Sequence, residues 1–149
     1  MNVRTASCRC GQLTVTCEGE PVRVWVCHCF ACQKRSGSAF AVQARWPDER
    51  VEIEGAAKTW QRSTDSGNLV TYRFCPTCGS TMAYTIDGWP GVTAVPVGNF
   101  TDLDFPAPKH SVWEYRKHHW VDILGEDVDR PTEASIQRKP GLNLRRKKD

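Results

Sequence analysis

Seven of the chain's eight cysteines fall into three short clusters, and any fold of this chain must bring their sulfur atoms together. The clusters are Cys8-Arg-Cys10, Cys27-His-Cys29-Phe-Ala-Cys32 and Cys75-Pro-Thr-Cys78. In an extended segment, residues i and i+2 point to the same side, so Cys8 and Cys10 present two thiols to one point. The same holds for Cys27 and Cys29. This spacing is typical of metal ligands.

Redox exchange and disulfide bonding are the other uses of clustered cysteines. Eight cysteines in 149 residues is about 5%, below the density of a small secreted disulfide scaffold. Residues 1–6 lack the apolar core of a signal peptide, which predicts a cytoplasmic protein. A reducing cytosol favours metal ligands or catalytic thiols over bridges. A thioredoxin-like Cys-x-x-Cys needs a βαβ context, whereas strand-like residues flank Cys75 and Cys78 on both sides. Metal binding is the favoured interpretation.

The seven clustered thiols divide most simply into one site with four ligands and one with three. The thiols of the second cluster span six residues and can meet at one ion without closing a long loop. The other two clusters then supply four sulfurs, from Cys8, Cys10, Cys75 and Cys78. Four protein ligands close a zinc site, whereas three leave a position open for chemistry. Spacing alone does not prove this partition.

Apolar residues recur with period two in several short segments, which predicts a mainly β fold with few short helices. The segments are 22–26, 40–46, 51–53, 70–74 and 82–86. Turn signals such as Asp87-Gly88 separate them. Cys17 alternates with threonines beside Leu13 and Val15, so it is predicted to be a small buried hydrophobe. Short helices are expected after Cys32 and over residues 132–138.

Length and charge predict a single zinc-binding β domain over residues 1–134, followed by a basic tail over residues 135–149. No apolar stretch approaches the ~18 residues that a membrane span needs. The whole chain carries a formal charge of +3, but residues 137–149 hold six basic residues and one acidic residue. The preceding residues therefore carry about −2, so a nucleic-acid partner is unlikely. The sequence does not predict the oligomeric state.

At these motifs the chain resembles the glutathione-dependent formaldehyde-activating enzyme family, which also includes centromere protein V. The resemblance runs from about Cys8 to about Trp120. Its marks are Cys8-x-Cys10-Gly11, Cys27-His28-Cys29-x-x-Cys32, Ser36-Gly37-Ser38-Ala39-Phe40 and Phe74-Cys75-Pro76-x-Cys78-Gly79-Ser80. The resemblance implies coiled antiparallel β-sheets organised around two zinc ions. It also implies a carbon–sulfur lyase reaction, in which S-(hydroxymethyl)glutathione is formed from, or split into, glutathione and formaldehyde.

The resemblance maps the open zinc site onto Cys27, Cys29 and Cys32, which are the expected catalytic residues. Three thiolates on Zn²⁺ leave a net charge of −1, which blunts its Lewis acidity and suits it poorly to generating hydroxide. A small thiol such as glutathione would instead enter the open position and lose its proton to the metal. The alternatives are a non-catalytic zinc-binding interaction module and a thiol sensor that loses zinc on oxidation.

The four residues from 34 to 37 are the expected substrate-binding residues. Lys34 and Arg35 follow Cys32 closely and are placed to meet a carboxylate of glutathione. The Ser36 hydroxyl can donate a hydrogen bond, and Gly37 permits close approach of backbone. Solvated charges and ordinary turn chemistry are the competing interpretation of all four. His28 should face away from the thiols on either side of it.

Overall fold

The computed structural model describes residues 1–132, so all but the first residue of the predicted helix over 132–138 and the whole basic tail over 135–149 lie outside the described residues. The strands are β1 Val3–Ser7, β2 Thr14–Glu18, β3 Arg23–Cys27, β4 Ala41–Pro47, β5 Val51–Glu54, β6 Lys58–Ser63, β7 Leu69–Phe74, β8 Thr81–Ile86, β9 Val92–Pro96 and β10 His110–Val112. The helix α1 is Phe30–Ser36, and the 3₁₀ turns are η1 Asp48–Arg50, η2 Val97–Phe100 and η3 Glu114–Arg116. Within the described residues, no helix has the length and apolarity needed to cross a bilayer.

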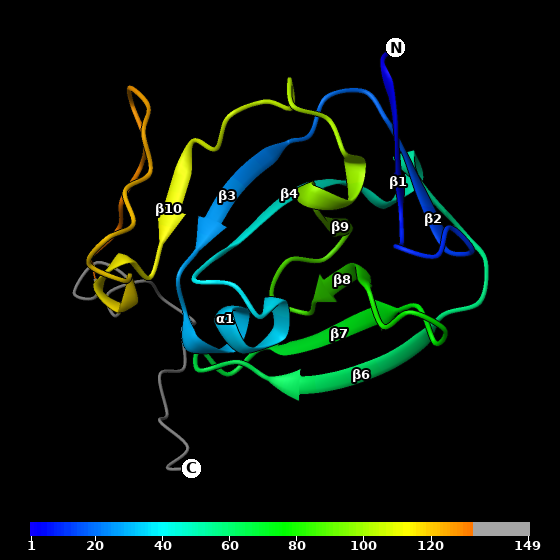
Figure 1. Ribbon diagram of the computed structural model, residues 1–149, viewed down its shortest axis with the longest axis horizontal. Helices are drawn as coiled ribbons and strands as arrows, with labels where there is room; N and C mark the ends of the chain where they lie inside the picture. Colours follow the sequence, from blue (N-terminus) through cyan, green and yellow to red (C-terminus); the bar gives the residue numbers. More distant parts are fainter. Residues whose placement is uncertain (133–149) are drawn as a thin grey trace.

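The larger sheet has seven strands in the order β10-β3-β4-β9-β8-β7-β6. Figure 1 shows it curling from β3 through β4, β9 and β8 round to β7 and β6. Its pairs are antiparallel except for β10 and β3, which run parallel. The predicted mainly β fold is confirmed, with this parallel pair as the exception to an antiparallel arrangement. The pair forms because the chain returns to the edge of β3 after the long segment 101–109.

The smaller sheet has the order β1-β2-β5 and shares a core with one face of the larger sheet. Leu13, Val15 and Cys17 alternate toward this core and are fully buried. The predicted burial of Cys17 is confirmed, and desolvation raises the pKa of its thiol to about 12. Trp46 of β4 is also fully buried, and its indole nitrogen donates to the Gly19 carbonyl at 2.9 Å.

The alternation predicted for residues 82–86 fails at one residue because β8 contains a bulge. Phe74 pairs with Thr81 and Arg73 pairs with Ala83, so Met82 has no partner on β7. An extra residue in one strand shifts the side-chain alternation beyond it. Met82 therefore packs into the core shared with the smaller sheet, whereas Tyr84 faces the concave side of the larger sheet.

Candidate functional site

The seven clustered cysteines form two separate groups in the folded chain. Cys8, Cys10, Cys75 and Cys78 make one group, and Cys27, Cys29 and Cys32 make the other. Within each group the sulfur atoms all lie within 4.8 Å of one another. This is the partition expected from the sequence, and both groups can hold a metal ion.

The four-cysteine group joins the two sheets. Cys8 and Cys10 follow β1, and Cys75 and Cys78 lie in the turn between β7 and β8. The Cys10 sulfur lies 3.6 Å from that of Cys8 and 3.7 Å from that of Cys75. A zinc ion with Zn–S bonds of ~2.3 Å needs tetrahedral sulfur–sulfur edges of about 3.8 Å. These two sulfur pairs thus already stand close to the spacing of a four-sulfur tetrahedral site.

Backbone and side-chain donors surround the sulfur atoms of this group. The amide of Cys78 donates to the Cys75 sulfur at 3.5 Å, and the turn closes with Gly79 at a φ of 79°. The Gln12 side chain donates to the same sulfur at 2.9 Å. The Ser80 hydroxyl, 3.3 Å from the Cys78 sulfur, is the main cause that lowers the pKa of Cys78 to about 5. Donors of this kind stabilise thiolates and orient metal ligands.

The three-cysteine group is built where β3 runs into α1. Cys27 ends β3, Cys29 caps α1, and Cys32 lies in its first turn. The Cys29 sulfur accepts a hydrogen bond from the Cys32 amide at 3.4 Å. Hydrogen bonds from the Cys27 and Cys32 thiols strongly lower the pKa of Cys29. Helix α1 contains Cys32, whereas the sequence analysis predicted a helix that begins after Cys32.

These three thiols line a cavity of about 320 Å³ on the concave side of the larger sheet. Aromatic side chains form much of its wall: Trp25, Tyr72, Tyr84, Trp89 and Trp113. Trp25 meets Trp89 edge to face, with ring centroids 5.7 Å apart. A largely apolar cavity with a few convergent polar groups is the usual form of a small-molecule site. The four-cysteine group does not line this cavity, so only the three-cysteine group is accessible from it.

His28 lies between two cysteines of the cavity but takes no part in their cluster. It is fully buried, and burial lowers its pKa. Its Nε2 lies 2.9 Å from the Ser111 hydroxyl oxygen, and that hydroxyl donates to Glu114 at 2.8 Å. Glu114 also pairs with Arg130. Neutral His28 must therefore donate from Nε2 to Ser111, which ties β10 to the cysteine loop.

We expect Ser111→Ala to lower the free energy of unfolding by about 1–3 kcal/mol, because it leaves the buried Nε2–H of His28 without an acceptor. Denaturant unfolding measures the change. Ser38→Ala is the matched control, because Ser38 is exposed and its substitution should cost less than about 0.5 kcal/mol. Equal stabilities of the two variants would show that this network does not hold the segment in place.

The predicted substrate-binding residues are spread along and beyond α1, and none of the four lines the cavity. Lys34 is exposed. The Arg35 guanidinium lies 5.7 Å and 5.6 Å from the ring centroids of Tyr72 and Tyr84, two residues of the cavity wall. The Ser36 hydroxyl donates to the Cys32 carbonyl at 2.8 Å, and Gly37 ends the helix at a φ of 66°. The contacts of Ser36 and Gly37 are those of a helix end.

Two arginines that the sequence analysis did not select line the cavity instead. Arg23 is the first residue of β3, and Arg62 lies in β6. The alternation of β3 could have identified Arg23 from the sequence, because Arg23 and Trp25 lie on the same face of the strand as Cys27. The sequence around Arg62 contains no pattern that would identify it. Arg62 lines the same cavity as the cysteines because the sheet curls.

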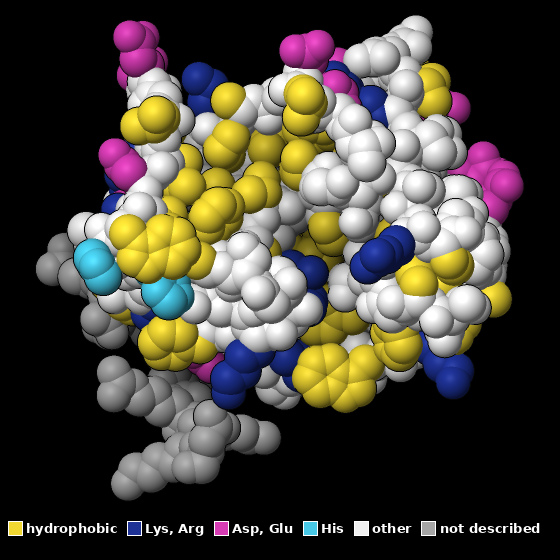
Figure 2. All heavy atoms as spheres, in the orientation of Figure 1, with side chains coloured by type: hydrophobic (Ala, Val, Ile, Leu, Met, Phe, Trp, Pro, Cys, Tyr) yellow, Lys and Arg dark blue, Asp and Glu magenta, His cyan; other side chains and the backbone are white. Residues whose placement is uncertain are grey.

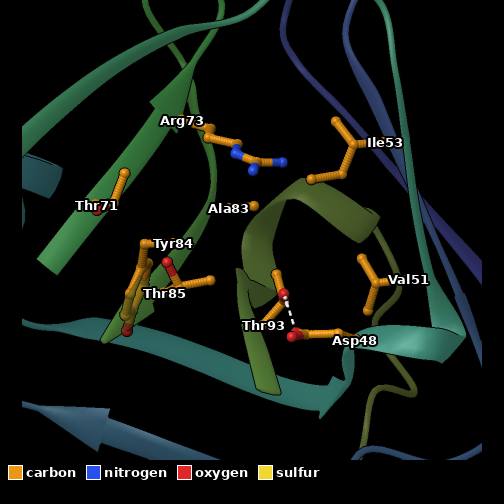
Figure 3. A pocket seen from close by; sticks show the side chains of 9 residues that line it. All are labelled: Asp48, Val51, Ile53, Thr71, Arg73, Ala83, Tyr84, Thr85 and Thr93. Atoms are coloured by element: carbon orange, nitrogen blue, oxygen red, sulfur yellow. Dashed lines mark hydrogen bonds between the residues drawn. The ribbon is translucent and has the colours of Figure 1, made fainter. Parts of the chain in front are cut away.

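A second cavity of about 340 Å³ lies on the other side of β7 and β8, against β5 and η1 (Figure 3). It contains no cysteine. In Figure 3 the Arg73 side chain points into it from β7, and Asp48 accepts a hydrogen bond from the Thr93 hydroxyl at 2.7 Å. The three-cysteine group therefore lines the first cavity and not this second one.

Comparisons with known proteins agree with this geometry. A comparison with curated proteins finds no significant match. The crystal structure of a Rhodobacter sphaeroides protein superposes with a TM-score of 0.50 and 21% sequence identity, over 64% of this chain and 85% of that one, which bears on the fold alone. The family model of the glutathione-dependent formaldehyde-activating enzymes matches residues 3–116. That span includes both cysteine groups and most of the cavity wall, so the chain belongs to the glutathione-dependent formaldehyde-activating enzyme family.

Proposed function

We propose that this chain is a zinc-dependent carbon–sulfur lyase-type enzyme that acts on a small thiol adduct such as S-(hydroxymethyl)glutathione. The observation that carries the proposal is the opening of three convergent thiols onto a cavity of about 320 Å³. A purely structural metal site would be closed by four ligands, as the other cysteine group is. A non-catalytic interaction module, the alternative function, needs no such cavity.

The donor set fits zinc at both sites. All seven ligands are thiols, and soft sulfur donors in a tetrahedral arrangement suit zinc over magnesium, calcium or manganese. Cys8, Cys10, Cys75 and Cys78 would hold the structural ion, and Cys27, Cys29 and Cys32 the one at the cavity. When bound there, zinc would supply the Lewis acidity that lets the thiol of a substrate ionise near neutral pH.

The reaction itself needs little beyond positioning. In the synthetic direction, the thiol sulfur adds to the carbonyl carbon of formaldehyde, and the proton that the thiol gives up ends on the carbonyl oxygen. In the lyase direction the same C–S bond breaks and free thiol and aldehyde form. The chain's contribution is to hold the sulfur atom at one end of an aromatic-walled cavity and to exclude bulk water from it. Cys27, Cys29 and Cys32 are the catalytic residues of this proposal.

A titration of the zinc-loaded protein tests the zinc–thiol part of the proposal. We expect glutathione to bind more tightly than S-methylglutathione, by tenfold or more, because a thioether sulfur cannot become a thiolate. Turnover of formaldehyde with glutathione, followed as loss of free aldehyde, measures the reaction. Equal affinity for the two ligands would rule out binding through a thiolate. Binding without turnover would favour the non-catalytic module.

A further inference from the structure

The cavity of the three-cysteine group is lined by arginines from nearly opposite ends of the larger sheet. Arg23 belongs to β3 and Arg62 to β6, and four strands lie between them in the sheet order. In a flat sheet, five steps of ~4.8 Å would place these strands about 24 Å apart. The curl seen in Figure 1 closes this distance, so both arginines line one cavity of about 320 Å³.

Arg23 stands at the end of β3 away from the metal loop. It shares a face with Trp25 and Cys27, and all three line the cavity. Four residues of strand rise ~3.3 Å each, so the α-carbons of Arg23 and Cys27 are about 13 Å apart. That distance suits an elongated ligand with its sulfur at the cysteines and an anionic group reached by the arginine side chain.

Arg62 approaches the cavity from the other side. Its Nε donates to the Tyr72 hydroxyl at 3.1 Å, and one terminal nitrogen donates to the Ser63 carbonyl at 3.2 Å. Its guanidinium carbon lies 5.9 Å from the Tyr72 ring centroid. These contacts hold the side chain in place without a carboxylate, and the negative charge near it is that of the Cys29 and Cys32 thiolates.

Neither arginine forms an ion pair within residues 1–132. The Nε of Arg23 is buried and has no hydrogen-bond partner. Of the two acidic residues of the lining, Asp65 pairs with Arg116 at 2.9 Å. Asp129 lies 3.4 Å from His110 and attracts Arg23 electrostatically, but it forms no ion pair with Arg23. A guanidinium withdrawn from water without a carboxylate is costly unless a ligand supplies the charge.

Two further arginines lie beside the aromatic wall of the cavity. The Arg45 guanidinium lies 4.8 Å from the Trp89 centroid, and that of Arg35 lies 5.7 Å and 5.6 Å from the centroids of Tyr72 and Tyr84. The buried Nε atoms of both side chains also lack partners. On the face drawn in Figure 2, Lys and Arg side chains lie both near the centre and at the edge, whereas acidic side chains lie mostly at the edge.

We infer that Arg23 and Arg62 are carboxylate-binding residues, and that the cavity selects a thiol with carboxylates at two ends over a neutral thiol of the same size. The identity of the ligand as a thiol rests on the proposed function; the selection for negative charge rests on the arginines alone. Arg62 and Arg23 thereby take the role that the sequence suggested for Lys34 and Arg35.

Calorimetric titration with two thiols tests the inference. The zinc-loaded wild type should bind glutathione at least tenfold more tightly than its diamide, in which neutral amides of nearly the same size replace both carboxylates. Arg62→Met and Arg23→Met should each remove about tenfold of glutathione affinity and leave the affinity for the diamide unchanged. Zinc content and the melting temperature show whether each variant is intact.

Arg73→Met and Lys34→Met are the matched controls. Arg73 is exposed and points into the other cavity (Figure 3), and Lys34 is exposed on α1, so both should keep the wild-type preference. Equal wild-type affinity for glutathione and its diamide would overturn the inference without any variant. So would a wild-type preference in both cavity arginine variants. Discrimination against S-methylglutathione reports separately on the proposed function, which stands or falls independently of these outcomes.

Discussion

Cys75→Ser is expected to leave the chain unfolded or insoluble. Cys75 is fully buried and belongs to the four-cysteine group, which links the loop after β1 to the turn after β7. Its sulfur meets that of Cys10 across 65 residues of sequence. Structural zinc contributes an apparent ~10–16 kcal/mol to small domains, whereas whole domains are stable by only about 5–15 kcal/mol. Loss of this site therefore removes a contribution as large as the stability itself.

Far-UV circular dichroism, thermal melting and zinc content measure the result. Cys17→Ala is the matched control, since Cys17 is equally buried but lies in neither cysteine group. It should fold, keep both metal ions and lose no more than a small core truncation costs, about 1 kcal/mol. A soluble Cys75→Ser protein with the wild-type melting temperature would show that the four-cysteine group is not structural.

The sequence predicted those features of the site that depend on local geometry. Paired thiols such as Cys8 and Cys10 converge because a strand repeats every two residues, and that repeat needs no knowledge of the fold. The same repeat placed Cys17 in the core. The grouping of thiols into four and three followed from the coordination number of zinc, a property of the metal that no tertiary contact changes.

Features that depend on long-range closure were not predictable in this way. The proximity of Arg62 to the cysteines comes from the curl of seven strands, and no window of sequence around β6 carries that information. The bulge at Met82 reverses the side-chain alternation of β8, so that Met82 and Tyr84 belong to different core clusters. The alternation of apolar residues in the sequence gives no sign of this bulge. His28 was expected to face away from the neighbouring thiols, and it stands outside their cluster. Its hydrogen bond, however, is with Ser111, more than 80 residues later in the chain.

Cys29→Ala is expected to give a folded protein that binds one zinc ion instead of two and has no detectable thiol-adduct activity. Two thiols remain at the cavity, and two ligands do not hold zinc. The four-cysteine group lies outside the cavity, so the fold should survive. The alanine also removes the cap of α1, because the Cys29 sulfur accepts from the Cys32 amide at 3.4 Å. That loss should cost about 0.5–2 kcal/mol.

Cys29→Ser separates the metal effect from the capping effect. Serine is a good N-cap but a poor ligand for zinc in place of a thiolate, so this variant should regain most of the helix-cap stability without regaining activity. Metal analysis, thermal melting and aldehyde consumption by the two variants give three independent measurements. If both variants lose the cavity zinc and the activity while only the alanine variant loses stability, Cys29 acts through the metal. Full activity in either variant would remove Cys29 from the mechanism, and the open three-thiol site would no longer explain the chemistry.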